Sequence, residues 1–411
     1  MAEATANDAK PPIRLLFLAT LSLGTGNRTT AERIQSHLNR YTHPRVECTA
    51  MDLGMLAKDP ANCSPALFDG YDLALGLHAF RSGQYLIHCP LPYAIILGGT
   101  DVNEAQELTN EQLDLMTLAV RRARGIVAFN ESLSAPALKR WPFLDGSRLR
   151  IIPQAVQIDT PQPPTPRAPT LHERLGLPVH PSRPADLAPI VLLLVAGLRP
   201  VKDPTFLFDI VSCWHRLDSR VHLAVIGPEL TPKCTSQVRE AADRSPGVHI
   251  LSAVPYAEAL WLMSQADFLL NSSLSEGLAS AVLEAMSLSV PLLARNIPGN
   301  AAVIQHGTTG CLFNQPAEMV ASALAYLPSS FAAPWLDDAA IAKLQNAVLS
   351  DSDISTIRSA AQTAAQCTLA EVTDRRSTLV AAAHRYVEHN HACDVEAAAY
   401  HGILRDWLIS S

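Results

Sequence analysis

Short apolar runs alternate with amphipathic stretches along most of the chain, and this alternation restricts the possible folds more than any other feature. An apolar run of strand length followed by a helical pattern is the repeat that builds a parallel sheet covered by helices. In the first half, the predicted strands are Ile13–Thr20, Leu73–Leu77, Tyr93–Leu97, Ile126–Phe129 and Leu149–Ile152. The predicted helices between them are Thr29–Arg40 and Glu104–Arg124.

A proline-rich stretch separates the two halves. Segment 160–189 has nine prolines between positions 161 and 189, which argues against a helix or a central strand and predicts an interdomain linker. The alternation starts again after it. The predicted strands of the second half are Ile190–Ala196, Val221–Ile226, Val248–Leu251, Phe268–Asn271 and Pro291–Ala294. The predicted helices are Pro204–Arg216, Tyr256–Gln265 and Leu278–Ser287.

With 411 residues the chain is too long for one ordinary domain, and the pattern predicts an α/β protein with two Rossmann-like, doubly wound domains. They are expected at 13–159 and 190–390, with the carboxyl ends of both sheets facing each other across a ligand-binding cleft. Residues 1–12 are predicted to be a disordered N-terminus. Segment 329–376 is predicted to be a helical insertion, to which the sequence assigns no role, and 391–411 a C-terminal helix.

Composition argues against several classes of protein. The formal net charge is −7, whereas a nucleic-acid-binding protein needs a basic face. The eight cysteines occur singly, without a Cys-x-x-Cys pair, which predicts reduced thiols. Met1–Pro12 lacks the apolar stretch of a signal peptide, and runs such as Ile190–Ala196 are too short to span a membrane. We therefore expect a cytoplasmic protein that binds no nucleic acid and has no transmembrane segment.

The segment from Asn271 to Met286 is the most informative about function. A buried strand is predicted to end at Asn271, and a turn rich in Ser and Gly leads into a helix that opens near Leu278. The first turn of a helix presents unpaired backbone N–H groups and the positive end of the helix dipole, which together bind a phosphate well. The residues expected to do so are Gly277, Leu278, Ala279 and Ser280.

Two glutamates accompany this turn. Glu276 precedes the predicted helix and Glu284 follows eight residues later, about 12 Å along a helix axis. Eight residues rotate a helix by roughly 80°, so both carboxylates are able to face one ligand. Carboxylates accept hydrogen bonds from sugar hydroxyls, and this spacing suits a sugar and a ribose on either side of a diphosphate. The alternative is a helix with two solvated glutamates.

Gly197–Lys202, directly after the first strand of the second half, supplies the cations that such a ligand needs. Arg199 is able to bind two phosphate oxygens at once, and Lys202 adds a point charge. Together they would neutralise the charge that develops on a departing diphosphate. The alternative is a surface Arg/Lys pair at the helix start before Pro204.

Ser-Glu-Gly at 275–277 and Glu-Ala-Met at 284–286, with seven residues between the two glutamates, resemble the signature of the family-4 retaining glycosyltransferases. The further landmarks of the resemblance are Thr25–Asn27, Gly98–Asn103, Gly197–Pro204 and Ala294–Ala302. The resemblance implies the two-domain GT-B fold. It also implies a nucleotide-diphosphate sugar as co-substrate, an acceptor that the sequence does not identify, and no other cofactor.

The resemblance also assigns roles to residues. Glu276 is expected to hold the sugar, Glu284 the ribose, and Arg199 and Lys202 the diphosphate, with Arg199 and Lys202 one or two residues closer together than in the commoner family pattern. The final helix of the family crosses back to the first domain. Here Cys393–Leu408 has an apolar stripe with a tryptophan, and we expect this helix to pack on the N-terminal domain. The stripe is made of Val395, Ala399, Ile403, Trp407 and Leu408.

Three groups in the first domain are candidates for the same site. The loop of Gly24, Thr25, Gly26 and Asn27 corresponds to a family loop that faces the donor phosphates, although a tight βα turn explains it nearly as well. Thr100 and Asp101 lie where many family members carry a sugar-binding histidine, and Asp101 is the polar substitute. His78 ends a predicted strand and is a candidate on the acceptor side, or else a structural histidine.

Four further segments are ambiguous. Asn296–Asn300 is predicted to close the donor pocket, or to be an ordinary Pro-Gly turn, and Gly227–Glu229 is a candidate for its border. Asp351–Asp353 has the form of an acidic metal-binding motif, but Asp and Ser are also expected at a helix start. Glu388–His391 with Cys393 lacks paired zinc spacing and is better explained as a linker.

The predicted activity is therefore transfer of a hexosyl group with retention of configuration and without a metal. In the resembled family the leaving phosphate itself takes the acceptor proton, so no dedicated base is needed. Two alternatives stay open, namely a catalytically degenerate nucleotide-sugar-binding protein and a nucleotide-sugar epimerase on the same scaffold. The separation of the two glutamates disfavours a retaining glycosidase.

Overall fold

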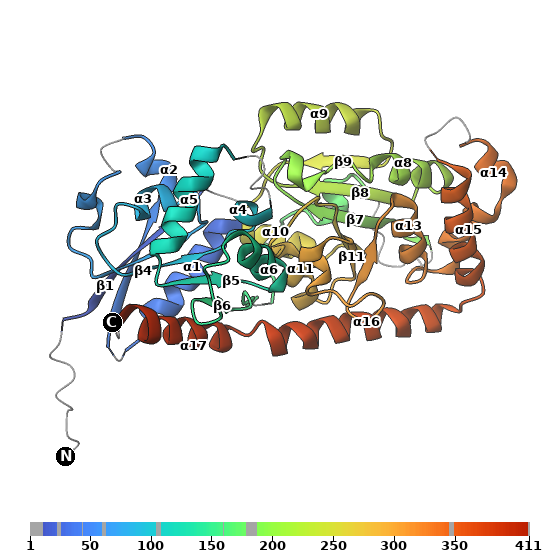
Figure 1. The fold of residues 1–411 in the computed structure, drawn as a ribbon. Coiled ribbons are helices and arrows are strands. Elements are labelled where there is room, and N and C mark those ends of the chain that lie inside the picture. The colour runs from blue at the N-terminus through green and yellow to red at the C-terminus, as the bar shows by residue number, and fades with distance from the viewer. Residues whose placement is uncertain are drawn as a thin grey trace, which may run out of the picture. The chain divides into compact units, whose positions relative to one another are not determined.

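The computed structural model describes residues 11–22, 26–42, 44–59, 63–103, 108–158, 160–177, 187–344 and 349–409. Most of the N-terminus that is predicted to be disordered, and the first residues of the predicted helix Glu104–Arg124, lie outside these ranges. The chain forms two compact units, coloured along the sequence in Figure 1. Unit 1 contains the described residues up to Ala155, Glu276–Leu278, and those from His391 onward; unit 2 contains Val156–Ser275 and Ala279–Asn390.

Unit 1 is built on a six-stranded parallel sheet with the order β2-β1-β3-β4-β5-β6. Its strands are β1 (Ile13–Ala19), β2 (Val46–Asp52), β3 (Leu73–Leu77), β4 (Tyr93–Ile96), β5 (Gly125–Ala128) and β6 (Leu149–Ile151). Its helices are α1 (Gly26–Asn39), α2 (Leu53–Leu56), α3 (Gly83–Leu86), α4 (Thr100–Asn103), α5 (Asn110–Arg122), α6 (Glu131–Arg140) and α17 (Cys393–Ile403). Strands of a parallel sheet are covered on both faces, and β3 and β4 are accordingly buried throughout.

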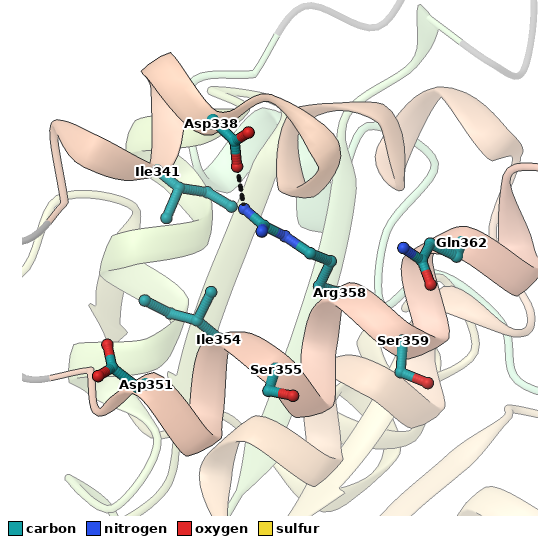
Figure 2. Close-up of a pocket in the computed structure, with 8 residues that line it drawn as sticks. All are labelled: Asp338, Ile341, Asp351, Ile354, Ser355, Arg358, Ser359 and Gln362. Carbon is teal, nitrogen blue, oxygen red and sulfur yellow. Dashed lines mark hydrogen bonds and ion pairs between the residues drawn. The ribbon is translucent and has the colours of Figure 1, made fainter.

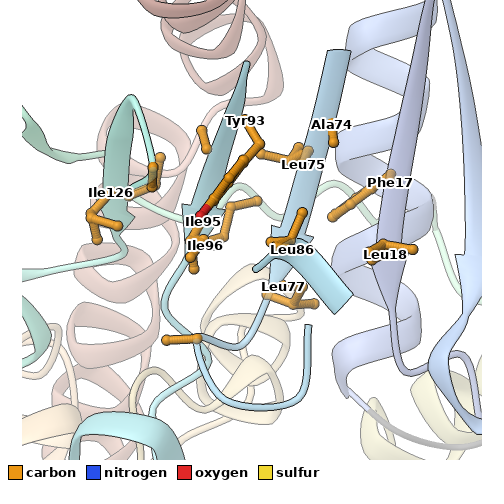
Figure 3. Packing of buried hydrophobic residues seen from close by; sticks show 14 of the residues in the cluster. Phe17, Leu18, Ala74, Leu75, Leu77, Leu86, Tyr93, Ile95, Ile96 and Ile126 are labelled. Carbon is orange, nitrogen blue, oxygen red and sulfur yellow. The ribbon is translucent and has the colours of Figure 1, made fainter. Parts of the chain in front are cut away.

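The core of unit 1 forms where side chains of neighbouring strands meet the covering helices. Figure 3 shows this packing, with side chains from β1, β3, β4 and β5 beside Leu86 of α3. The labelled strand residues are Phe17, Leu18, Ala74, Leu75, Leu77, Tyr93, Ile95, Ile96 and Ile126. All of them have less than a tenth of their surface exposed, so the sheet is a rigid support for the loops at its edges.

The last helix, α17, lies beside α1, as Figure 1 shows in dark red and blue. Glu396 is 1% exposed and accepts hydrogen bonds from the Arg33 guanidinium at 2.7 Å and 3.2 Å, and its Oε2 lies 2.9 Å from His37 Nε2. Burial works against this carboxylate, but the hydrogen bond from His37 and the charge of Arg33 hold the pKa of Glu396 below its usual value. Tyr400 and Trp407 belong to the hydrophobic core of unit 1.

Two details of the predicted C-terminal helix are wrong. Val395 is 53% exposed and is not part of the buried stripe, whereas Glu396 is buried because the Arg33 guanidinium compensates its charge and His37 lies within hydrogen-bond distance. The regular helix ends at Ile403, and Leu404–Ile409 continues as a wider π-helical turn.

Unit 2 has a second six-stranded parallel sheet, with the order β12-β11-β10-β7-β8-β9. Its strands are β7 (Ile190–Val195), β8 (Val221–Ile226), β9 (Val248–Leu251), β10 (Phe268–Asn271), β11 (Leu292–Arg295) and β12 (Cys311–Phe313). Its helices are α7 (Leu171–Arg174), α8 (Phe208–Leu217), α9 (Pro232–Asp243), α10 (Tyr256–Met263), α11 (Ser280–Ser287), α12 (Pro298–Ala301), α13 (Pro316–Leu324), α14 (Asp338–Ala342), α15 (Asp351–Ala364) and α16 (Leu369–Asn390). The two sheets confirm the predicted pair of doubly wound α/β domains.

The proline-rich segment contains one element that the sequence analysis excluded. Leu171–Arg174 forms a single helical turn, because this interval has no proline and Thr170 and Glu173 make a capping box at its start. Leu171 is fully buried in unit 2.

The helical insertion also has a structural role. Phe331, Trp335 and Ile357 are fully buried and join the hydrophobic core of unit 2. Among the described helices, none combines the length and the apolar character needed to cross a bilayer.

Candidate functional site

The sheet of unit 2 has a topological switch point between β7 and β10. The chain continues from β7 to β8 on one side, whereas β10 pairs with β7 on the other side, so the loops that leave these two strands diverge at the carboxyl edge. Ligands of doubly wound sheets bind at such points. The loop after β7 carries Arg199 and Lys202, and the loop after β10 leads into α11 with Glu284. The structure therefore brings the two predicted loops together.

Lys202 ends a single 3₁₀ turn that begins directly after Arg199. Two hydrogen bonds join this turn to the loop after β10. The backbone N–H of Leu274 donates to the Val201 carbonyl, and the Ser272 hydroxyl donates to the Lys202 carbonyl, both at 2.9 Å. The backbone that carries the two cations is thus fixed to the neighbouring loop, while the residues Arg199 and Lys202 remain partly exposed.

Glu284 lies in α11 and is 7% exposed. The hydroxyl of Tyr256, the first residue of α10, donates a hydrogen bond to Glu284 Oε1 at 2.9 Å. Sequence reasoning did not identify Tyr256, although its place at the start of the helix that follows β9 puts it at the same sheet edge. A buried carboxylate oriented by a phenol accepts further hydrogen bonds in a defined direction, which suits a ligand hydroxyl.

The helix that carries Glu284 starts later than predicted. α11 begins at Ser280 rather than at Leu278, Ala279 is its N-cap, and no side chain caps this end. Of the residues whose backbone N–H groups the sequence assigns to a phosphate, Ala279 and Ser280 lie at this helix start, whereas Gly277 and Leu278 precede it. The assignment stays a prediction for all four.

The later start has a physical reason in Glu276–Leu278, which groups with unit 1. The side-chain amide of Asn130 donates to the Gly277 carbonyl at 2.7 Å and holds the segment outside helical geometry. Gly277 also approaches Gly99, which has a φ of +97°, so closely that a Cβ on Gly277 would lie 3.0 Å from the Gly99 Cα. The helical rise and rotation argued for Glu276 and Glu284 therefore do not apply, because the helix begins four residues after Glu276 instead of two.

The predicted segment Asn296–Asn300 ends in the short helix α12. Asn300 is fully buried, and its side-chain amide donates to Asn271 Oδ1 at 3.0 Å and to the Arg295 carbonyl at 2.9 Å. Asn300 thus joins the ends of β10 and β11. In the Gly227–Glu229 segment, the Pro228 carbonyl accepts a hydrogen bond from the backbone of Leu198 at 2.8 Å, so this segment lies beside the loop after β7.

In unit 1, the corresponding switch point lies between β1 and β3. Gly24 and Thr25, in the loop after β1, lie outside the described residues. Gly26 and Asn27 form the first turn of α1, which begins three residues before the predicted start at Thr29. Before the loop, the backbone N–H of Leu21 donates to the Asp52 carboxylate at 2.9 Å.

His78 follows β3 and has a φ of +80°, which is uncommon for a residue other than glycine. Its Nδ1 accepts a hydrogen bond from the Arg81 backbone at 3.2 Å, and its Nε2 lies 2.9 Å from the Thr100 hydroxyl. Burial lowers the pKa of His78, although the Asp101 carboxylate opposes this shift. The imidazole is therefore neutral near pH 7.

Asp101 is 1% exposed, and its carboxylate is used by the backbone. It accepts a hydrogen bond from Ala79 N–H at 2.6 Å and from Gly98 N–H at 3.0 Å and 3.1 Å, so it joins the loops after β3 and β4. The predicted contacts of Asp101, Thr100 and His78 with an acceptor stay predictions. In the structure, the hydrogen bonds of these residues connect the loops after β3 and β4 at the carboxyl edge of the sheet.

The two metal-like motifs have structural explanations. Ser350 caps α15, and the Asp353 carboxylate accepts hydrogen bonds from the Ser350 backbone N–H at 3.0 Å and from its hydroxyl at 2.7 Å. His391 is 4% exposed between α16 and α17 and lies 2.7 Å from the Gln154 carbonyl. Within the described ranges, no three His, Cys, Asp or Glu side chains are arranged to hold a metal.

Asp351 lines a pocket of about 510 Å³ between α14 and α15, shown in Figure 2. Across it, Asp338 pairs with Arg358 at 2.5 Å. This pocket contains none of the predicted site residues. Its lining is Asp338, Ile341, Asp351, Ile354, Ser355, Arg358, Ser359 and Gln362.

Solved structures show which fold this is. Alr3699/HepE from Anabaena, solved with UDP and glucose, has a TM-score of 0.65 at 15% identity and covers 96% of this chain and 99% of its own. Sucrose-phosphate synthase from Thermosynechococcus elongatus has a TM-score of 0.65 at 16% identity, over 97% of this chain and all of its own. The two six-stranded parallel sheets are thus those of the GT-B fold.

Sequence comparison identifies the family. The model of the glycosyl transferases group 1 family matches residues 179–330. Glycosyltransferase 1 domain-containing protein 1 from Xenopus tropicalis is 34% identical over 308 residues, which cover 75% of this chain and 86% of that protein. Alpha-maltose-1-phosphate synthase from Mycobacterium tuberculosis is 27% identical over 49% of this chain and 51% of that enzyme. The chain belongs to the glycosyl transferases group 1 family, family 4 of the glycosyltransferases.

Proposed function

We propose that the chain is a retaining glycosyltransferase that transfers a hexosyl group from a nucleotide-diphosphate sugar to an acceptor without a metal ion. The observation that carries the proposal is the switch point of unit 2, where the loop of Arg199 and Lys202 is hydrogen-bonded to the loop after β10. Cations belong at this position in an enzyme whose leaving group is a diphosphate. The buried Glu284, oriented by Tyr256, is the acceptor of hydrogen bonds from the ribose.

In the proposed reaction, the bond between the sugar C1 and the diphosphate oxygen breaks and a bond from C1 to the acceptor oxygen forms on the same face. The acceptor proton goes to the leaving phosphate oxygen. Arg199 and Lys202 stabilise the charge that develops on the diphosphate, the start of α11 at Ala279 and Ser280 adds N–H donors, and Glu276 holds the sugar. Family membership and the charges at the switch point support these roles.

A thermal-shift screen with UDP-, GDP- and ADP-sugars tests the proposal, since a ligand that binds only the folded state raises the melting temperature. Uridine donors come first because Alr3699/HepE has been solved with UDP-glucose. Slow hydrolysis of the donor that binds best, with release of the free sugar, is the expected result. Binding without hydrolysis or transfer would identify a degenerate binding protein, and conversion of the sugar within the donor would identify an epimerase.

A further inference from the structure

Asp203, directly after Lys202, has a backbone conformation that is uncommon for a residue other than glycine. Its φ of 42° and ψ of 54° lie in the left-handed region, which glycine adopts without strain and other residues adopt rarely. Strained residues persist where their surroundings hold them, and they concentrate at functional sites. The surroundings of Asp203 must therefore hold it in this conformation.

Arg295, the last residue of β11, holds the Asp203 side chain. Its NH1 donates to Asp203 Oδ2 at 2.8 Å and to the Ser272 carbonyl at 3.3 Å, and its guanidinium stacks on the Phe206 ring at 3.9 Å. The side chains of Asp203 and Arg295 are 28% and 21% exposed, so water screens the ion pair only in part. The guanidinium is held by a charge, a carbonyl and an aromatic face at once.

Through Ser272 this ion pair reaches the proposed diphosphate site. Arg295 holds the Ser272 carbonyl, and the hydroxyl of the same serine donates to the Lys202 carbonyl. Asp203 follows Lys202 directly in the chain, so the bond from Arg295 to Asp203 also restrains the backbone on the C-terminal side of Lys202. We propose that Asp203 and Arg295 are a positioning pair that sets the direction of Lys202 toward the diphosphate of the donor, an inference that rests on the proposed function.

The charges add a second, testable consequence. Without Arg295, the Asp203 carboxylate would stand uncompensated beside a bound diphosphate and repel it. Loss of Arg295 should therefore cost more affinity than loss of Asp203, and removing both should recover part of the loss. A role in packing alone predicts that the two losses add.

Calorimetric titration with UDP, GDP and ADP, and with the matching monophosphates, tests this on the full chain. Arg295→Met should weaken binding of the preferred diphosphate by about 30-fold, and Asp203→Gly by about fivefold, while the monophosphate changes less than about twofold. Asp203→Gly/Arg295→Met should bind like Asp203→Gly alone. Arg216→Met, an exposed arginine on α8, is the matched control.

The outcomes separate the two proposals. If the wild-type chain binds no diphosphate, the proposed function fails and the inference fails with it. If the wild type binds but Arg295→Met weakens diphosphate and monophosphate equally, or the double variant is weaker than either single variant, only the positioning pair is refuted. Should Arg295→Met not fold, Arg295→Lys tests the same point, since it keeps the charge but loses the fork that reaches both Asp203 and Ser272.

Discussion

Both sheets have charged residues at their carboxyl edges, but these residues have different roles at the two edges. At the carboxyl edge of the unit 1 sheet, Asp101 accepts hydrogen bonds from the backbone of the loops after β3 and β4, and His78 is neutral near pH 7. At the switch point of unit 2, Lys202 lies beside the Asp203–Arg295 ion pair. One edge uses charge to hold its own loops, whereas the other concentrates charge around a position where a ligand binds in this fold. The contrast at the unit 2 edge is what we expect of a site for a charged donor.

Replacement of Lys202 is the strongest test of the contrast. Lys202→Ala should lower kcat/KM for the donor by about 100-fold, or about 2.7 kcal/mol of transition-state stabilisation, because the charge on the leaving diphosphate loses its partner. Initial rates of donor hydrolysis measure the effect. Lys233→Ala, which removes an exposed lysine from α9 of the same unit, is the control and should be neutral. A Lys202→Ala variant as active as this control would show that Lys202 does not stabilise the leaving diphosphate.

The two glutamates should have intermediate effects. Glu276→Gln and Glu284→Gln should each lower donor-dependent turnover by about tenfold, which corresponds to about 1.4 kcal/mol and to one hydrogen bond involving a charged group. Saturation curves for the donor measure this, with Glu240→Gln on the exposed side of α9 as the control. Wild-type rates for both variants would show that neither carboxylate contacts the donor.

At the unit 1 edge the expected loss is in stability instead. Asp101→Asn replaces one carboxylate oxygen by an N–H₂ group that faces backbone donors, and should lower the free energy of unfolding by about 2 kcal/mol. Nucleotide affinity should change less than about twofold. Urea unfolding and calorimetric titration measure the two quantities, and Asp114→Asn on the exposed face of α5 is the control. A stable Asp101→Asn variant with weakened nucleotide binding would show that Asp101 contributes to ligand binding and not to the stability of the folded chain.

His78 predicts a smaller, pH-dependent effect. Because burial lowers the pKa of His78 in the folded chain, the unfolded chain binds a proton more readily, and stability falls as the pH drops below about 6.5 toward the folded pKa. His78→Asn, which tolerates positive φ, should flatten that part of the curve. Melting temperatures between pH 7.5 and 5 provide the measurement. An unchanged slope would mean that burial does not lower the pKa of His78 in the folded chain.

The smallest expected effect is none. If protein cations supply the positive charge at the diphosphate, EDTA should leave donor turnover unchanged. Loss of activity with EDTA and its recovery with Mn²⁺ would instead make the acidic residues Asp351 and Asp353 candidates for metal binding, despite the capping role of Asp353.

The sequence predicts this architecture well where strands are central and apolar. Leu73–Leu77, Val221–Ile226 and Phe268–Asn271 have the predicted bounds, because burial on both faces leaves a continuous apolar run. Two strands were missed, β2 and β12. Both lie at a sheet edge, where β2 alternates with polar residues and β12 is only three residues long.

The candidate site was predictable by residue type but not by geometry. Strand ends identify the loop of Lys202 and the loop that leads into the helix of Glu284, since carboxyl ends of parallel strands share one edge. The later start of α11 was not predictable, because it depends on the contact of Gly277 with Asn130, 147 residues away in the sequence. Tyr256 and Arg295 were missed for the same reason: each acts through a partner that only the folded chain brings near.

Unit 1 combines the first and the last segments of the chain, which has a consequence for folding during synthesis. Its core includes Tyr400 and Trp407, and its buried ion pair needs Glu396, yet these residues are translated after all of unit 2. Unit 2 spans a nearly contiguous stretch and is able to complete its core first. We therefore expect unit 2 to complete its core before unit 1, the reverse of the usual order in which the N-terminal domain folds first. Until residues 391–409 have been synthesised, Arg33 and His37 on α1 lack Glu396 as a partner, and we expect unit 1 to expose apolar surface for longer than unit 2.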